Sequence, residues 1–243
     1  MEHVDGVGPD GRGVAAGEGI EWWSRAWALF MKQPLLWIIG GIIFIVINAG
    51  LHVVPVLGSF AAALLTPVLF GGWMIAARKV DQTGELEIGD LFDGFKSALN
   101  PLLVVGAVLL ACEVGIALFT GMLGLGVLGA IGVGGLAGSP ATMAAGLGIG
   151  MVGILVAVVL FFVVMMALWF APPLIVFDGM APMDAMKASV AASLRNVVPF
   201  LLYDVVLLVV GCLATLPALL GWILLMPVYL ITMYTSYRSV FGR

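Results

Sequence analysis

Residues 148–170, GIGMVGILVAVVLFFVVMMALWF, decide the fold of this chain. The stretch contains no charged residue. It is long enough to cross the hydrocarbon core of a bilayer, roughly 30 Å, as one α-helix of about 20 residues. Five more apolar stretches lie on either side of it, at about 35–54, 60–77, 102–119, 198–216 and 219–237. We therefore predict an all-α, polytopic transmembrane helical bundle with six spans.

The third of these stretches does not end where a bilayer would end. It continues into a Gly-rich apolar segment, 121–138, that is longer than one crossing requires. This segment fits a helix extension, a tilted helix or a re-entrant piece, and the sequence does not choose among them.

The composition agrees with a lipid-embedded fold. Of the 243 residues, 63% are hydrophobic and only 10% are charged, whereas a soluble domain carries about 25% charged residues. A soluble fold could not hide this much apolar surface, so lipid must act as the solvent. The net charge of −4 and the lack of a basic cluster argue against a nucleic-acid partner.

The basic residues indicate the orientation. Threading the chain six times from a cytoplasmic N-terminus leaves no Lys or Arg in an outer loop, as the positive-inside rule requires. Both termini are then cytoplasmic. The ten residues are Arg12, Arg25, Lys32, Arg78, Lys79, Lys96, Lys187, Arg195, Arg238 and Arg243.

The first 20 residues differ from the rest. They are Gly-rich and acidic, and they lack the basic start and apolar core of a signal peptide. We expect a disordered cytoplasmic tail over 1–20, followed by a six-span membrane domain over 21–243.

A repeat divides that domain into units of about 21–80, 88–177 and 181–243. In each unit an amphipathic segment is followed by a proline that opens a span, then by an outer turn and a second span containing proline. The opening prolines are Pro34, Pro101 and Pro199, and the later ones are Pro67, Pro172, Pro173 and Pro227. Because the pattern recurs in the same direction each time, we predict three pseudo-repeated units, each made of an interfacial helix and a helical hairpin.

The amphipathic segment of the first unit carries an aromatic face. Trp23, Trp27 and Phe30 recur at i, i+4 and i+7, next to Trp22. Because tryptophan favours the headgroup region, we expect these four residues to be interfacial anchors.

Polar residues within the predicted spans are the candidate site. Asp204 can reach Tyr229 and Thr232, whereas Glu113 can reach Asn48, His52 or Thr120. An intramembrane acid is a functional candidate by default. The other interpretation is a structural one, in which polar contacts hold helices together by about 0.6–2 kcal/mol each. The wide spread of these residues over different spans favours the structural interpretation.

The glycines have a packing explanation as well. Their spacing lets helix backbones approach closely, either between spans three and four or in a homo-oligomer. They include Gly121, Gly124, Gly129, Gly134, Gly138, Gly146, Gly150 and Gly153.

Signatures of catalysis and of metal binding are weak. The two histidines, His3 and His52, cannot build a triad or a zinc site with the residues near them in sequence. Cys112 and Cys212 lie inside spans and fit small packing residues better than a disulfide. The spacing of Met180, Met183 and Met186 fits an apolar helix face better than a Cu(I) site. We therefore expect no enzyme activity, no metal and no cofactor.

Four segments resemble a known family. They are LFMKQPLLW at 29–37, LWFAP at 168–172, DAMKAS at 184–189 and RNVVPF at 195–200. Together they resemble uncharacterised proteobacterial six-span inner-membrane proteins, akin in layout to the membrane domain of some glycerophosphoryl diester phosphodiesterases. The resemblance implies a location in the bacterial inner membrane and transfers no active site.

Two function hypotheses remain. The first is a non-enzymatic accessory or interaction subunit that packs against membrane lipids, another membrane protein or a second copy of itself. The second is a transporter or channel for a small or lipidic solute, with Asp204 and Glu113 as the working acids.

Overall fold

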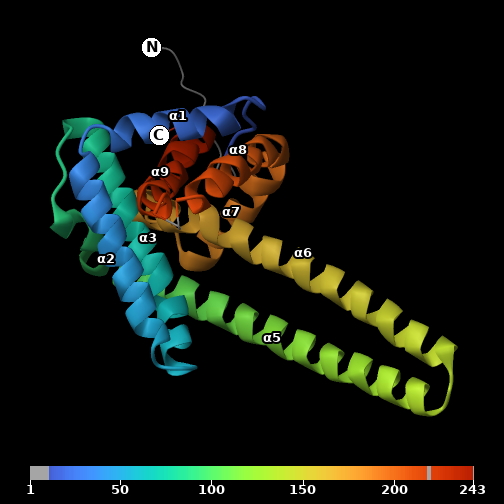
Figure 1. The fold of residues 1–243 in the computed structure, drawn as a ribbon. Coiled ribbons are helices and arrows are strands. Elements are labelled where there is room, and N and C mark those ends of the chain that lie inside the picture. The colour runs from blue at the N-terminus through green and yellow to red at the C-terminus, as the bar shows by residue number, and fades with distance from the viewer. Residues whose placement is uncertain (1–10, 218–219, 243) are drawn as a thin grey trace. The chain divides into compact units, whose positions relative to one another are not determined.

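The computed structural model describes residues 11–217 and 220–242, and every element in this part is helical (Figure 1). The predicted all-α class is confirmed. The part of the predicted tail that covers residues 1–10 lies outside the described residues. The elements are α1 (Glu18–Phe30), α2 (Pro34–His52), α3 (Leu57–Thr83), η1 (Ile88–Phe92), α4 (Gly94–Ser97), α5 (Leu99–Leu136), α6 (Pro140–Asp178), α7 (Pro182–Arg195), α8 (Val197–Thr215) and α9 (Trp222–Phe241).

Five helices in the described ranges are long and apolar enough to cross a membrane: α2, α3, α5, α6 and α8. The predicted sixth span, 219–237, falls mostly on α9, which is not one of the five. The second half of α9 is rich in hydroxyl side chains, and Thr232, Thr235 and Ser236 are buried inside the protein. Their hydroxyl groups lower the mean hydropathy of α9. They face other helices of the protein and not its surface.

The path of residues 121–138 is now defined. They continue α5 without a break to Leu136, and the chain then turns at Gly138, whose φ is +60°. α5 has 38 residues and α6 has 39, so each is about 57–58 Å long. A continuous helix over this segment fits a helix extension or a tilted helix, two of the three possibilities that the sequence left open.

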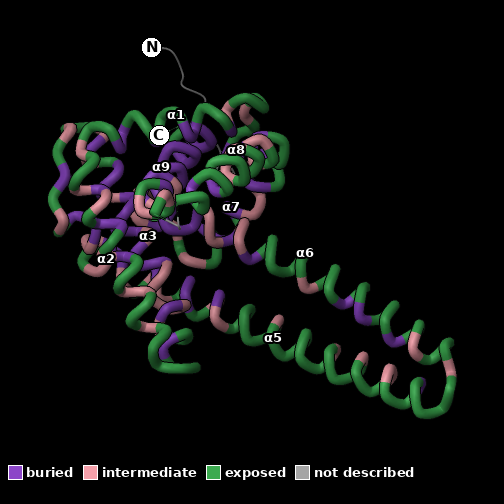
Figure 2. The backbone as a smooth tube through the Cα atoms, in the orientation of Figure 1, coloured by how far each residue is buried: buried purple, intermediate pink, exposed green. Residues whose placement is uncertain are grey.

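The chain forms two compact units. We call Met1–Ala107 together with Ala167–Arg243 the core unit, and Val108–Met166 the hairpin unit. The hairpin unit contains the C-terminal part of α5, the turn after it and the N-terminal part of α6. Most of its residues are exposed (Figure 2). Buried residues concentrate in the core unit.

The aromatic face of α1 is buried against protein. Trp22 is fully buried with its ring 5.2 Å from that of Phe200, and Trp23 stacks on Tyr203 at 5.1 Å. Phe30 is also buried, whereas Trp27 is half exposed. The expectation of four interfacial anchors is therefore corrected: only Trp27 remains open to a headgroup layer. The predicted face differs from the buried one, since Trp27 lies on it and Trp22 beside it, and α1 packs on α8 and α9.

The segment before α1 is held by hydrogen bonds. The Arg12 backbone N–H donates to the carbonyl of Val240 at 2.9 Å, and the Val14 N–H donates to Oδ1 of Asn196 at 2.8 Å. The Asn196 amide in turn donates to the carbonyl of Arg12 at 3.0 Å. Residues 11–17 are thus tied to the core unit, and α1 begins at Glu18, inside the range for which we predicted a disordered tail. The Gly-rich composition indicates local flexibility. It does not show that the distant Asn196 side chain hydrogen-bonds the backbone of this segment.

Two glycines allow α3 to touch the segment that follows it. A Cβ at Gly94 would lie 2.2 Å from the carbonyl oxygen of Val68, and one at Gly72 would lie 1.9 Å from that of Leu91. Real side-chain atoms do not approach a backbone oxygen so closely. The absence of a side chain at both positions is therefore what lets η1 and α4 pack on α3.

We predict that Gly94→Ala destabilises the core unit by about 1–3 kcal/mol, because a backbone contact cannot relax as a side chain does. The measurement is the folded fraction in detergent after stepwise heating. Gly89→Ala in η1 is the matched control, since a Cβ there meets nothing within 4 Å. Equal stability of the two variants would contradict this account of the packing.

Candidate functional site

Neither Tyr229 nor Thr232, the predicted partners of Asp204, forms a hydrogen bond with its carboxylate. Thr232 is fully buried, and its hydroxyl shares a hydrogen bond of 2.9 Å with that of Tyr203. Tyr229 packs its ring edge-to-face on Trp169 at 5.8 Å. Asp204 itself is exposed on α8 and has no hydrogen bond to any described residue. Tyr203 and Thr232 therefore form a hydrogen-bonded pair, and Asp204 lies near Tyr203 and Tyr229 without a hydrogen bond to either.

The other predicted polar residues bond within their own helices. The Asn48 amide donates to the carbonyl of Phe44 at 2.9 Å, and Nδ1 of His52 lies 2.8 Å from the carbonyl oxygen of Asn48. Thr120 donates to the carbonyl of Ile116 at 2.9 Å. Glu113 is exposed on α5. The hydrogen bonds of Asn48, His52 and Thr120 therefore each stay within one helix.

Part of the glycine pattern packs the hairpin unit. A Cβ at Gly153 would lie 1.8 Å from a side-chain carbon of Leu123, and one at Gly150 would lie 2.9 Å from Val127. By contrast, Gly121 and Gly124 have nothing within 4 Å of an added Cβ. Glycines of α6 therefore let the two helices approach each other, while several glycines of α5 face open space.

The outer face of the hairpin unit is apolar and exposed. Leu125 is 73% exposed and Met151 is 74% exposed, and Glu113 is the one charged residue in the sequence from 108 to 166. Contiguous apolar patches above a few hundred Å² mark contact with lipid or protein. We call this face the hairpin surface. Its large exposed side chains are Val114, Leu118, Phe119, Met122, Leu125, Leu128, Val133, Leu136, Leu147, Ile149, Met151, Val152, Ile154, Leu155, Val156, Val158, Val159, Leu160, Phe161, Phe162 and Val163.

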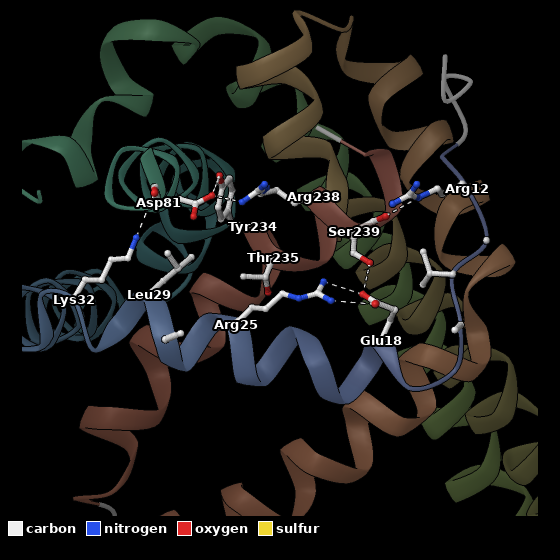
Figure 3. Close-up of a pocket in the computed structure, with 14 residues that line it drawn as sticks. Arg12, Glu18, Arg25, Leu29, Lys32, Asp81, Tyr234, Thr235, Arg238 and Ser239 are labelled. Carbon is white, nitrogen blue, oxygen red and sulfur yellow. Dashed lines mark hydrogen bonds and ion pairs between the residues drawn. The ribbon is translucent and has the colours of Figure 1, made fainter. Parts of the chain in front are cut away.

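A polar pocket of about 780 Å³ lies within the core unit (Figure 3). Four segments far apart in the sequence build it: the ordered residues before α1, one face of α1, the end of α3 and the end of α9. Sequence reasoning missed it, although it placed the basic residues on one side. The lining residues are Arg12, Gly13, Val14, Ala15, Glu18, Arg25, Ala28, Leu29, Lys32, Asp81, Tyr234, Thr235, Arg238 and Ser239.

The two carboxylates of the pocket, Glu18 and Asp81, each form an ion pair with an arginine. Arg25 donates to both oxygens of Glu18, at 2.9 and 3.1 Å, and the Ser239 hydroxyl adds a bond of 2.7 Å. The hydrogen bonds from Arg25 are the main cause that lowers the pKa of Glu18 below its usual value. On the other side, Arg238 pairs with Asp81, to which the hydroxyl of Tyr234 also donates at 2.9 Å.

The two remaining cations of the pocket contact backbone oxygens. Nε of Arg12 donates to the carbonyl of Ser239 at 3.0 Å. The Lys32 ammonium donates to the carbonyls of Val80 and Asp81 at 3.2 and 3.3 Å. Across residues 11–217 and 220–242, neither Arg12 nor Lys32 forms an ion pair with a carboxylate.

Glu18→Gln is predicted to cost about 0.5–1 kcal/mol of stability at pH 7, as expected for a partly exposed pair. Because the pKa of Glu18 is lowered in the folded state, its contribution is complete above the ordinary carboxyl value of 4.5. The contribution disappears as the pH falls through the lowered folded-state pKa. Chemical unfolding in detergent between pH 7 and pH 3 measures the difference. Glu21→Gln, on the same helix but outside the pocket, is the control, and a pH-independent difference for Glu18→Gln would rule out this role.

Comparison with known proteins identifies the family but not an activity. A family model described as a domain of unknown function, DUF7847, matches residues 24–240. A protein of Burkholderia thailandensis named as a probable inner membrane protein is 28% identical over 257 residues, covering 94% of this chain and 93% of that protein. No solved structure matches the chain. Since the family model spans nearly the whole helical region, the chain belongs to the DUF7847 family.

Proposed function

We propose that this protein is a non-enzymatic, integral protein of the bacterial inner membrane that acts as an accessory subunit by packing against another membrane protein. The observation that carries the proposal is the hairpin surface. It is formed by two apolar helices whose side chains are mostly exposed within the hairpin unit. Glu113 is the one charged residue of this part of the sequence. The name of the Burkholderia relative supports the membrane location.

The open glycines of α5 favour a protein partner over lipid alone. Gly121, Gly124 and Gly132 would meet nothing within 4 Å with an added Cβ. In a membrane, helix association depends on small residues that let backbones come close, because lipid tails are as apolar as leucine. Lipid contact gives no comparable use for glycines on an exposed helix.

The finer layout belongs to the same proposal. α9 would be the sixth span, and the chain would repeat a short helix plus a hairpin three times. The element order supports this: α1 precedes α2 and α3, α4 precedes α5 and α6, and α7 precedes α8 and α9. Prolines lie inside α3, α6 and α9. Both termini would be cytoplasmic, in a layout akin to the membrane domain of glycerophosphoryl diester phosphodiesterases.

Transport of a small or lipidic solute is the second candidate. The observation in its favour is Asp204, an exposed carboxylate on the apolar helix α8 without a hydrogen-bond partner among the described residues. Glu113 is exposed in the same way on α5. This candidate ranks second because the polar pocket of the core unit is lined by neither acid.

Photo-crosslinking tests the accessory role. With p-benzoylphenylalanine at Leu125 or Met151, we expect ultraviolet light on native membranes to give one discrete adduct with another protein. The control position is Leu208, which is 67% exposed but lies on α8 of the core unit. An adduct of doubled mass would identify a second copy as the partner. Hairpin positions that label only lipid would contradict the proposal.

Asp204→Asn separates the two candidates. For an accessory subunit the change should leave partner recovery intact and alter stability by less than about 0.5 kcal/mol, since Asp204 makes no hydrogen bond that would be lost. Partner recovery after affinity purification and heat stability are the measurements. A variant that folds and keeps its partner but abolishes a solute flux in proteoliposomes would reverse the ranking.

A further inference from the structure

The pocket beside α1 carries more positive than negative charge. Arg12, Arg25, Lys32 and Arg238 line it, against only Glu18 and Asp81, which leaves a surplus of two positive charges. Such a cluster attracts anions, and most strongly where low-dielectric walls reduce screening.

Each of the two acids pairs with one arginine of the pocket. Both oxygens of Glu18 accept from Arg25, and one of them also accepts from Ser239. Asp81 is held by Arg238 and by the hydroxyl of Tyr234. Two arginines are thus held by ion pairs, whereas Arg12 and Lys32 form no ion pair with a carboxylate of the described residues.

Arg12 and Lys32, the two cations without an ion pair among the described residues, lie at opposite ends of the pocket (Figure 3). Figure 3 shows Lys32 at one end of the pocket and Arg12 at the other, with Arg238 and Arg25 between them. Each is tied to backbone carbonyls, Lys32 to those of Val80 and Asp81 and Arg12 to that of Ser239. These bonds fix where the charges stand without cancelling them.

We propose that this pocket binds a phosphate-bearing anionic ligand, with Arg12 and Lys32 supplying its uncompensated charge. Phosphate suits a site built of guanidinium and ammonium groups, since its oxygens accept several charge-assisted hydrogen bonds at once. The volume of about 780 Å³ exceeds the needs of a lone phosphate and falls in the range of organic ligand sites. The phosphate can come from a phospholipid headgroup or from a soluble compound. The inference does not depend on the partner of the hairpin surface.

The test uses the full chain, purified in detergent and freed of lipid. One arm measures retention of phosphatidylglycerol against phosphatidylcholine by native mass spectrometry. The other measures binding of inorganic phosphate by calorimetry. We expect the double variant Arg12→Gln/Lys32→Gln to weaken binding of at least one probe by about tenfold or more, which is about 1.4 kcal/mol. Loss confined to phosphatidylglycerol identifies a headgroup site, and loss of phosphate binding identifies a soluble ligand.

The matched control is Lys96→Gln/Lys187→Gln, which changes the net charge equally. Both lysines are exposed outside the pocket, and each pairs with an aspartate three residues earlier in the sequence, Asp93 and Asp184. This control should change either affinity less than about threefold, as expected for surface charges screened by salt. Equal losses in the two double variants, or no binding of either probe to the wild-type chain, would overturn the proposal.

A measurement on the wild-type chain covers the case in which the double variant fails to fold. Acetylation of lysines is followed by mass spectrometry with and without the probe that binds. The bound probe should slow modification of Lys32 by about threefold or more relative to Lys96 and Lys187, because it covers an ammonium within hydrogen-bond reach. If the probe slowed modification of Lys32 no more than that of Lys96 and Lys187, the pocket would not be the binding site.

Discussion

The packing of α1 across α8 and α9 is the interaction on which the core unit depends. Trp22 and Trp23 bury their rings against Phe200 and Tyr203. The Thr235 hydroxyl donates to the carbonyl of Trp22 at 2.9 Å, which fixes α1 on α9. Gly19 permits the contact, since a Cβ there would lie 2.0 Å from the carbonyl oxygen of Pro199. This packing sets Glu18 and Arg25 along one wall of the pocket, and the ordered residues before α1 close its end. The same contact therefore stabilises the fold and assembles the charges.

The hairpin unit follows a different rule. Its helices satisfy their backbone groups internally, as any segment in hydrocarbon must, and they contact each other where the glycines of α6 meet side chains of α5. Little else is buried, so the remaining apolar side chains need lipid or protein around them. This contrast between a core rich in buried hydroxyls and a hairpin almost free of charge gives the molecule two kinds of surface. The proposed accessory role uses the apolar one, and the proposed anion site uses the polar one.

The sequence predicted what depends on length and composition, and it missed what depends on tertiary contacts. Apolar runs of about 20 residues located α2 and α8 to within a few residues, because a helix is the local solution for such a run in lipid. Residues 121–138 stayed open because the apolar segment is longer than one crossing of a bilayer requires, which allows more than one path. The spacing of Trp23, Trp27 and Phe30 predicted a face in the headgroup region, but Trp23 and Phe30 are buried in the protein. The pocket was beyond prediction, since Arg12, Arg25, Lys32 and Arg238 meet only after four distant segments pack together.

The most direct test of the account uses the two native cysteines. Cys112 and Cys212 are free and exposed at the protein surface, on the apolar helices α5 and α8. Maleimide alkylation requires a hydrated thiolate, which hydrocarbon does not provide. In native membranes both thiols should resist N-ethylmaleimide until the membrane is dissolved in denaturant. The control is Met31→Cys, at a position that is 55% exposed at the end of α1, where the thiol should react at once. Reaction of Cys112 and Cys212 at the rate of that control would contradict a lipid-embedded protein.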